Sequence, residues 1–94
     1  MIKTDLTEIL QALGDPVRLA IVRELAGGET RACGSFTHLG VSHSTLSHHF
    51  KVLREAGVIE TRAEGSARLN RLRREGIDAL YPGLLASVLA VGQA

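Results

Sequence analysis

The chain has 94 residues, enough for one small domain, and with aromatic residues at only 3% its core must be packed from Leu, Ile, Val and Ala. A single cysteine excludes an intrachain disulfide, and without a signal peptide or an apolar run of about 18 residues we expect a cytoplasmic protein that does not enter a membrane. The net charge of +1 requires no nucleic-acid partner, but residues 49–94 hold seven basic and five acidic residues against four and five in residues 1–48, so we expect the positive surface in the second half.

The first part of the chain predicts two helices in succession. In residues 4–13, leucines and an isoleucine recur at the i, i+3, i+4, i+7 spacing of an amphipathic helix, and Gly14 ends the pattern. Asp15 is then a suitable N-cap, and Pro16 fits the first position of a second helix. This second helix is apolar nearly all round until it stops at Gly27, so we expect it to be buried.

The middle of the chain predicts a short element, a turn and a longer helix. Residues 29–32 are compatible with a short extended piece, and residues 33–39 with a two-turn helix closed by Gly40. Ser42 is a strong N-cap candidate for the next helix, which should run to Ala56. Two helices joined by a tight turn form a helix-turn-helix.

The last third predicts a hairpin followed by an apolar helix. Residues 58–72 form two short runs around a polar centre, with Gly65 in the turn, and the arms carry Arg62, Arg68 and Arg71. Residues 77–91 read as an apolar helix interrupted at Pro82, which one small domain cannot cover alone. We therefore expect a single domain over residues 1–94, mainly α with a small β-hairpin wing: a winged helix-turn-helix of about five helices.

The histidines of "VSHSTLSHHF", residues 41–50, raise the question of a metal site. On a helical wheel His49 falls on the apolar stripe, where a satisfied core or interface histidine is a better interpretation than a metal ligand. His43 and His48 are five residues apart, so their side chains diverge and do not close on one ion as an i, i+4 pair would. Chelation within this helix is therefore disfavoured.

The opposite face of the same helix carries hydroxyls, an imidazole and a lysine: Ser44, Ser47, His48 and Lys51, with Glu55 beyond them. Short donors and acceptors without a large apolar group let a helix enter a major groove, with Lys51 directed to a phosphate. The alternative is an ordinary solvated helix face. The position of the helix, second in a helix-turn-helix and followed by a basic wing, favours DNA binding.

These residues also resemble a known family. The segment "LGDPVRLAIVRELAGGE" looks like the opening of the ArsR/SmtB family of winged-helix repressors, and "VSHSTLSHHFKVLREAGVIETRAEGSARLNRL" resembles its recognition helix and wing. The resemblance implies a homodimer whose first and last helices pair across a two-fold axis. It also implies a transcriptional repressor that binds a double-stranded DNA operator of imperfect two-fold symmetry and releases it when a metal or another inducer binds.

Two sets of site residues follow from this interpretation. We expect DNA binding from the start and outward face of the recognition helix and from the wing, with the last three residues on phosphates: Ser42, His43, Ser44, Thr45, Ser47, His48, Lys51, Arg62 and Arg68. We expect the dimer interface to consist of apolar residues near the two chain ends: Leu6, Ile9, Leu10, Leu80, Tyr81, Leu84, Leu85 and Val88. Ser66 stands at the wing tip, where relatives often have a basic residue.

The metal sites that the resemblance implies are incomplete in this chain. A cysteine pair would precede the turn, but the sequence has Arg31-x-Cys33, and the last helix offers Asp78 without a histidine. Three interpretations of Cys33 stay open: a packing residue, a redox or electrophile sensor whose thiol pKa is lowered by Arg31, or a metal ligand with His38 or with groups of the other subunit. DNA binding could be regulated by a transition metal, by oxidation of Cys33 or by a partner protein. The sequence therefore assigns no cofactor.

Two other function classes compete with a DNA-binding regulator. A winged-helix interaction module or co-regulator, which acts with a partner protein and binds DNA only weakly by itself, would explain the small net charge and the neutral wing tip. An enzyme is not expected, because the sequence shows no paired carboxylates, no nucleophile with a base and no phosphate-cradling glycine motif.

Overall fold

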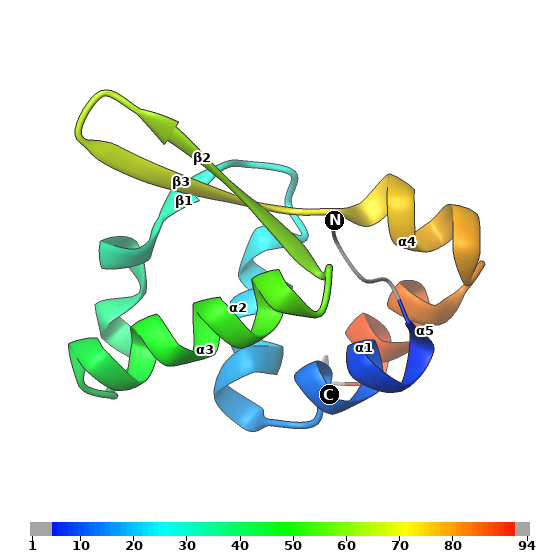
Figure 1. Ribbon diagram of the computed structural model, residues 1–94. Coiled ribbons are helices and arrows are strands. Elements are labelled where there is room, and N and C mark those ends of the chain that lie inside the picture. Colours follow the sequence, from blue (N-terminus) through cyan, green and yellow to red (C-terminus); the bar gives the residue numbers. More distant parts are fainter. Residues whose placement is uncertain (1–4, 92–94) are drawn as a thin grey trace.

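Five α-helices, one 3-10 helix and a three-stranded sheet make up residues 5–91, the part of the chain that the computed structural model describes. In chain order these elements are α1 (Leu6–Leu13), α2 (Pro16–Leu25), β1 (Arg31–Ala32), η1 (Cys33–Leu39), α3 (His43–Glu55), β2 (Ile59–Glu64), β3 (Ala67–Leu72), α4 (Arg74–Leu80) and α5 (Leu84–Val91). The hairpin of β2 and β3 projects above α3, whereas α1, α4 and α5 gather at the other end of the molecule (Figure 1). The predicted winged helix-turn-helix is confirmed.

The predicted helix caps are present. The Asp15 carboxylate accepts the backbone N–H of Val17 over 2.8 Å and that of Arg18 over 3.1 Å, and Pro16 occupies the first turn of α2. The Ser42 hydroxyl accepts the backbone N–H of Thr45 over 3.2 Å at the start of α3. Each such cap is worth about 1 kcal/mol because it satisfies an N–H group that has no partner within the helix.

The core is largely aliphatic, as the composition predicts, and lies between the helices and the base of the sheet. Two phenylalanines join it, since Phe36 of η1 and Phe50 of α3 meet edge to face with ring centroids 5.3 Å apart. The fully buried side chains come from most elements: Ile9, Ile21, Val22, Leu25, Phe36, Leu46, Leu53, Val58, Ile59, Ile77 and Leu85. Because α3 contributes two of them, Leu46 and Leu53, the side of α3 that faces the core is set, and the opposite side must face outward.

The wing is a tight hairpin extended by a third strand. Glu64 pairs with Ala67, so two residues form the turn, and Gly65 adopts a φ of 61° that a glycine accommodates without strain. The strand order is β1-β3-β2, all antiparallel. The buried Asn70 side chain links all three strands, because its amide donates to the Arg31 carbonyl over 3.1 Å and accepts from the Thr61 hydroxyl over 2.8 Å.

The C-terminal region differs from the single interrupted helix expected over residues 77–91. The structure has two helices, and α4 already begins at Arg74. The backbone leaves the helix at Tyr81 (φ −133°), Pro82 follows, and Gly83 has a φ of 85° before α5 begins. Proline has no N–H to continue a helix, so the break separates two elements rather than bending one. No helix in residues 5–91 has both the length and the apolar character needed to span a membrane.

Candidate DNA-binding interface

The outward face of α3 is exposed as the sequence predicts. Six residues at the start and along this side are exposed: His43, Ser44, Thr45, Ser47, His48 and Lys51. The inward side buries Leu46, His49, Phe50 and Leu53. Small hydroxyls, imidazoles and one ammonium group therefore cover a helix surface without a large apolar side chain, which suits contact with groove edges and phosphates.

Ser42, which was also predicted to bind DNA, differs from these six exposed residues. Its hydroxyl accepts the N–H of Thr45 and donates to the Thr45 hydroxyl over 2.8 Å, so its proton is used within the helix. Ser42 therefore positions the start of α3, and the Thr45 hydroxyl keeps its own proton for an outside acceptor.

His49 is a core histidine, which confirms the interpretation of its place on the helical wheel. It is 9% exposed, and its Nδ1 lies 3.1 Å from Nη1 of Arg18. Because a guanidinium donates and never accepts, the Nδ1 atom of His49 is the acceptor. Arg18 also donates to the Ala12 carbonyl over 2.6 Å, so one side chain joins α1, α2 and α3.

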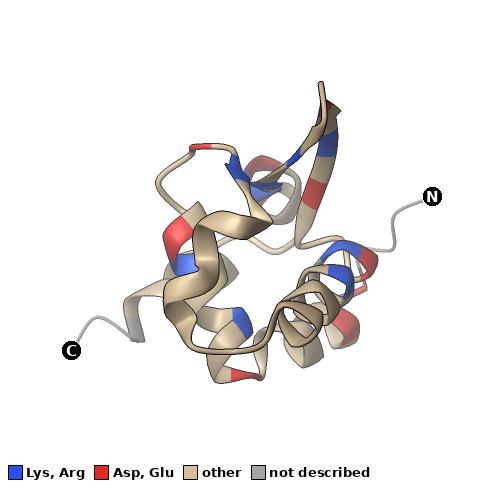
Figure 2. Cartoon of the chain, turned by 90° about the vertical axis from the view of Figure 1, so that its left-hand side faces the viewer, with Lys and Arg blue, Asp and Glu red and all other residues tan. Residues whose placement is uncertain are grey.

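The arginines of the wing differ in their partners. Arg71 donates to Glu60 over 2.9 Å, and Arg62 lies 3.1 Å from Glu64 with both side chains about two-thirds exposed (65% and 63%). Acidic and basic positions accordingly alternate along β2 in Figure 2, whereas the charged positions of β3 are all basic. Arg68 has no hydrogen bond or ion pair to any residue in the described part of the chain.

A hollow of about 160 Å³ lies where α3 meets the wing, and we call it the helix–wing corner. It is lined by Cys33, Ser47, Phe50, Arg54, Thr61, Arg68 and Asn70. The half-buried Arg54 was not predicted as a site residue, and within residues 5–91 its side chain has no hydrogen-bond or ionic partner. Its spacing of seven from Ser47 was the available signal, since residues two turns apart share one helix face.

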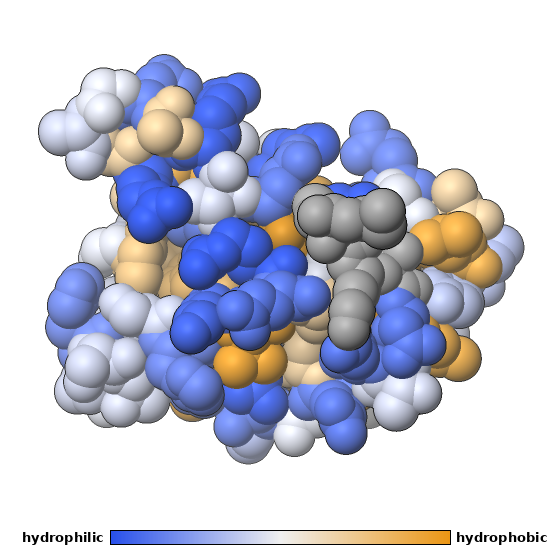
Figure 3. Space-filling view, in the orientation of Figure 1, coloured by the Kyte–Doolittle hydropathy of each residue, from blue (hydrophilic) through white to orange (hydrophobic). Residues whose placement is uncertain are grey.

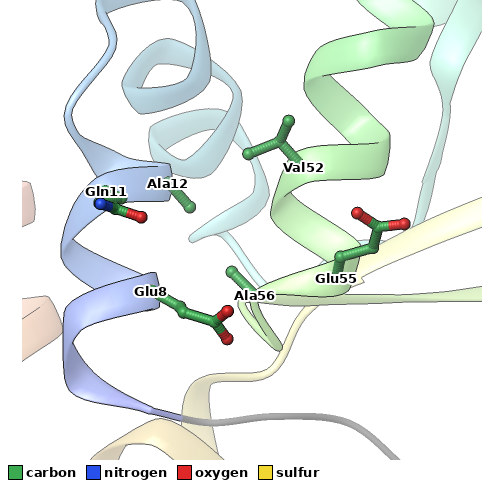
Figure 4. Close-up of a pocket in the computed structure, with 6 residues that line it drawn as sticks. All are labelled: Glu8, Gln11, Ala12, Val52, Glu55 and Ala56. Atoms are coloured by element: carbon green, nitrogen blue, oxygen red, sulfur yellow. The ribbon is translucent and has the colours of Figure 1, made fainter.

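A second hollow lies on the other flank of α3, against α1 (Figure 4). Two glutamates, Glu8 and Glu55, are among its lining residues. The Glu8 side chain points into it, and no donor among the described residues reaches its buried Oε2 atom. The two flanks of α3 therefore have opposite charge, and only the flank next to the wing suits an anion.

The structure contradicts one of the three interpretations of Cys33, that of a sensor whose thiol pKa is lowered by Arg31. The Arg31 guanidinium donates to Glu24 over 2.7 Å and lies 4.3 Å from the centroid of the Phe36 ring. Burial raises the pKa of the Cys33 thiol above its ordinary value, the reverse of what thiolate activation requires.

The weak metal candidates Cys33 and His38 are not brought together with further ligands. His38 Nε2 lies 2.7 Å from Glu24 Oε2 and so forms part of the Arg31–Glu24 cluster. In residues 5–91, no three or more side chains of His, Cys, Asp or Glu are placed to hold one metal ion.

The predicted dimer interface is corrected at two positions. Ile9 and Leu85 have no exposed surface in the single chain, so they pack in its own core and offer nothing to a partner. Three leucines of the predicted set are exposed to an unusual degree: Leu6 (39%), Leu10 (48%) and Leu80 (54%). Tyr81, Leu84 and Val88 are half-buried. Apolar side chains reach the surface at the right of Figure 3, over the region of α4.

Comparison with known proteins agrees with this architecture. The family of bacterial regulatory proteins called arsR matches residues 15–61, from the cap of α2 into β2. The arsenical resistance operon repressor of Staphylococcus xylosus is 38% identical over 80 residues, which are 85% of this chain and 77% of that protein.

Two solved structures have the same fold. The transcriptional repressor BigR from Xylella fastidiosa superimposes with a TM-score of 0.72 at 29% identity, over 95% of this chain and 87% of that one. A homodimeric winged helix-turn-helix DNA-binding domain from Mycobacterium bovis gives 0.73 at 29% identity, over 94% and 80%. From the family match and the identity over most of its length, the chain belongs to the arsR family of bacterial regulatory proteins.

Proposed function

We propose that the chain is a homodimeric repressor that binds double-stranded DNA with α3 in the major groove and the β2–β3 hairpin against the neighbouring backbone. The observation that carries this proposal is the exposed polar face of α3, flanked by the unpartnered Arg54 and Arg68. Relatives that are named as repressors and a neighbour described as a DNA-binding domain support it. Repression of a bacterial operator would take place in the cytoplasm.

The contacts divide into two classes. Ser44, Ser47 and His48 present groups that match base edges, with Thr45 and His43 at the margin of the face. Lys51, Arg62 and Arg68 present charges suited to phosphates. The exposed ion pair between Arg62 and Glu64 contributes less than about 1 kcal/mol to stability, so a phosphate can displace the glutamate.

A dimer follows from the exposed leucines. Leu6 and Leu10 lie one turn apart on α1, and Leu80 ends α4. Apolar groups of this size so exposed near one end of a small domain mark a contact surface. To bind two half-sites, such a dimer has to place its two copies of α3 about 34–36 Å apart, one helical turn of DNA.

Fluorescence anisotropy with duplexes from the promoter region of the protein's own gene tests this function. We expect binding at low salt that weakens steeply as salt increases, together with a dimer in sedimentation. If the anisotropy of no duplex increases on addition of the protein, even at low salt, the proposal is overturned. That result would favour an interaction module that works through a partner protein, consistent with the neutralised wing tip.

A further inference from the structure

The helix–wing corner lies where DNA geometry requires a sugar–phosphate strand. The major and minor grooves of a duplex are separated by one backbone strand, so a helix in one groove and a hairpin at its edge must have that strand between them. The corner is the hollow between α3 and the hairpin. This inference rests on the proposed function, because it assumes that α3 enters the major groove.

The chemistry of the corner is that of an anion site. Two arginines line it, Arg54 from α3 and Arg68 from β3, together with Ser47 and Thr61. No aspartate or glutamate lines the hollow. A half-buried cation without a counter-ion is costly, so an arginine kept in this state is explained when its ligand supplies the negative charge.

Three arginines outside the corner show the contrast, although Arg23 on α2 also has no carboxylate partner among the described residues. Arg31, Arg62 and Arg71 are each paired with a glutamate, at 2.7 Å to Glu24, 3.1 Å to Glu64 and 2.9 Å to Glu60. The two corner arginines come from different elements, line the same hollow and have no such partner within residues 5–91. The hollow on the opposite flank of α3 is acidic, so attraction for a phosphate strand is confined to the wing side.

We propose that the helix–wing corner binds one backbone phosphate of duplex DNA in each half-site, held mainly by Arg54 and completed by Arg68. Arg54 donates two N–H groups to the phosphate oxygens, as the planar guanidinium favours. The contact fixes the register of α3 along the groove and does not depend on base sequence.

Arg54→Gln tests the proposal, with Arg74→Gln on the distant α4 as a control that removes the same charge. We expect Arg54→Gln to weaken binding about tenfold for each half-site, because one charge-assisted contact is lost in each. It should also reduce the slope of log K against log salt by about 1.8, because the dimer loses two phosphate contacts, with unchanged preference among operator variants. The control should keep the wild-type slope. An Arg54→Gln protein that keeps the wild-type thermal midpoint, affinity and slope would overturn the assignment.

Neutral methylphosphonate linkages in the operator locate the phosphate. One position in each half-site should weaken wild-type binding yet have little effect on Arg54→Gln, since the same contact is removed from either side. Additive losses at every position would contradict a shared contact. If no wild-type binding is found with any duplex, the proposed function fails and this inference with it; binding that is insensitive to Arg54 removes this inference alone.

The single cysteine offers an independent test in the native fold, because Cys33 lines the corner. Carboxymethylation with iodoacetate adds a negative charge there, and carbamidomethylation with iodoacetamide adds a neutral group of similar size. We expect the charged adduct to weaken duplex binding several-fold more than the neutral one. Equal effects of the two adducts would show that no phosphate lies in the corner.

Calorimetry with inorganic phosphate gives a further check. Binding of free phosphate that depends on Arg54, together with duplex binding that does not, would indicate a small-anion site and overturn the proposal.

Discussion

Nη1 of Arg18 lies 3.1 Å from Nδ1 of His49, which joins the start of α2 to the middle of α3. The same guanidinium donates to the carbonyls of Ala12 over 2.6 Å and Gln11 over 3.3 Å, near the end of α1. Three helices therefore depend on one side chain, and the orientation of the outward face of α3 depends on it as well.

Replacing Arg18 by Ala should lower the free energy of unfolding by about 2 kcal/mol, because buried acceptors on two helices lose a charged donor. Urea denaturation with an unchanged m value would measure the loss. Arg74→Ala, which removes one exposed hydrogen bond of 3.3 Å to the Ala26 carbonyl, is the control and should change stability by less than about 0.5 kcal/mol. Similar losses in both variants would mean that packing alone holds His49.

Ser42 and Ser47 should separate folding from DNA binding. Ser42→Ala removes the N-cap of α3 and should cost about 1 kcal/mol of stability. Ser47→Ala lies on the exposed face and should keep the thermal midpoint while weakening operator binding. Thermal melts and anisotropy on the two proteins give the comparison; a Ser47→Ala protein with full affinity would remove Ser47 from the contact set.

His48 and Lys51 should differ in what they recognise. Lys51→Ala should weaken binding to all duplexes and reduce the salt slope by about one unit for each phosphate contact that is lost. His48→Ala should instead relax the preference at one operator position, measured with single-base variants. Unchanged preference would exclude His48 from base recognition.

Leu10→Glu should separate the dimer, because it puts a charge on a side chain that is 48% exposed within the proposed interface. Sedimentation velocity should then show a monomer with weaker operator binding, since the two half-sites no longer bind together. Gln11→Glu changes the neighbouring exposed residue and should remain dimeric. A dimer that survives Leu10→Glu would place the interface elsewhere.

Glu24 should make stability depend on pH in the acid range. Burial of Glu24 raises its carboxyl pKa, but hydrogen bonds from His38 and Arg31 outweigh this, so the folded pKa lies below the ordinary 4.5. The stabilisation is therefore present above the unfolded pKa and is lost as pH falls through the folded pKa. Urea titrations at pH 7, 4 and 3 should show the wild-type advantage over Glu24→Gln shrinking with acid. A constant difference would assign the effect to packing.

Local signals explain which parts of the fold could be predicted. Asp15, Ser42 and Gly65 act on their immediate neighbours, so a cap or a turn is visible in a few residues of sequence. The short extended piece expected over residues 29–32 contains β1, but its pairing with β3 joins segments nearly 40 positions apart, which no local pattern predicts.

The site was predictable where it follows from one helix and not where it depends on tertiary contacts. The helical period identified the exposed face with Ser47 and His48. The partner of Arg31 lies on another helix, so the sequence could offer an effect of Arg31 on Cys33 only as one of three interpretations and gave no sign of Glu24. Periodicity likewise marks Ile9 and Leu10 as apolar without showing which one faces the chain's own core.

The β2–β3 hairpin is attached to the core at one end only. Its inner end is held by the buried residues Ile59 and Leu72. Every residue from Arg62 to Arg68 is exposed and does not pack in the core. Substitutions at the tip can therefore change charge or reach with little effect on folding, because the stabilising contacts lie at the opposite end of the same two strands. Operator affinity and thermodynamic stability can thus vary independently within twelve residues paired as two strands.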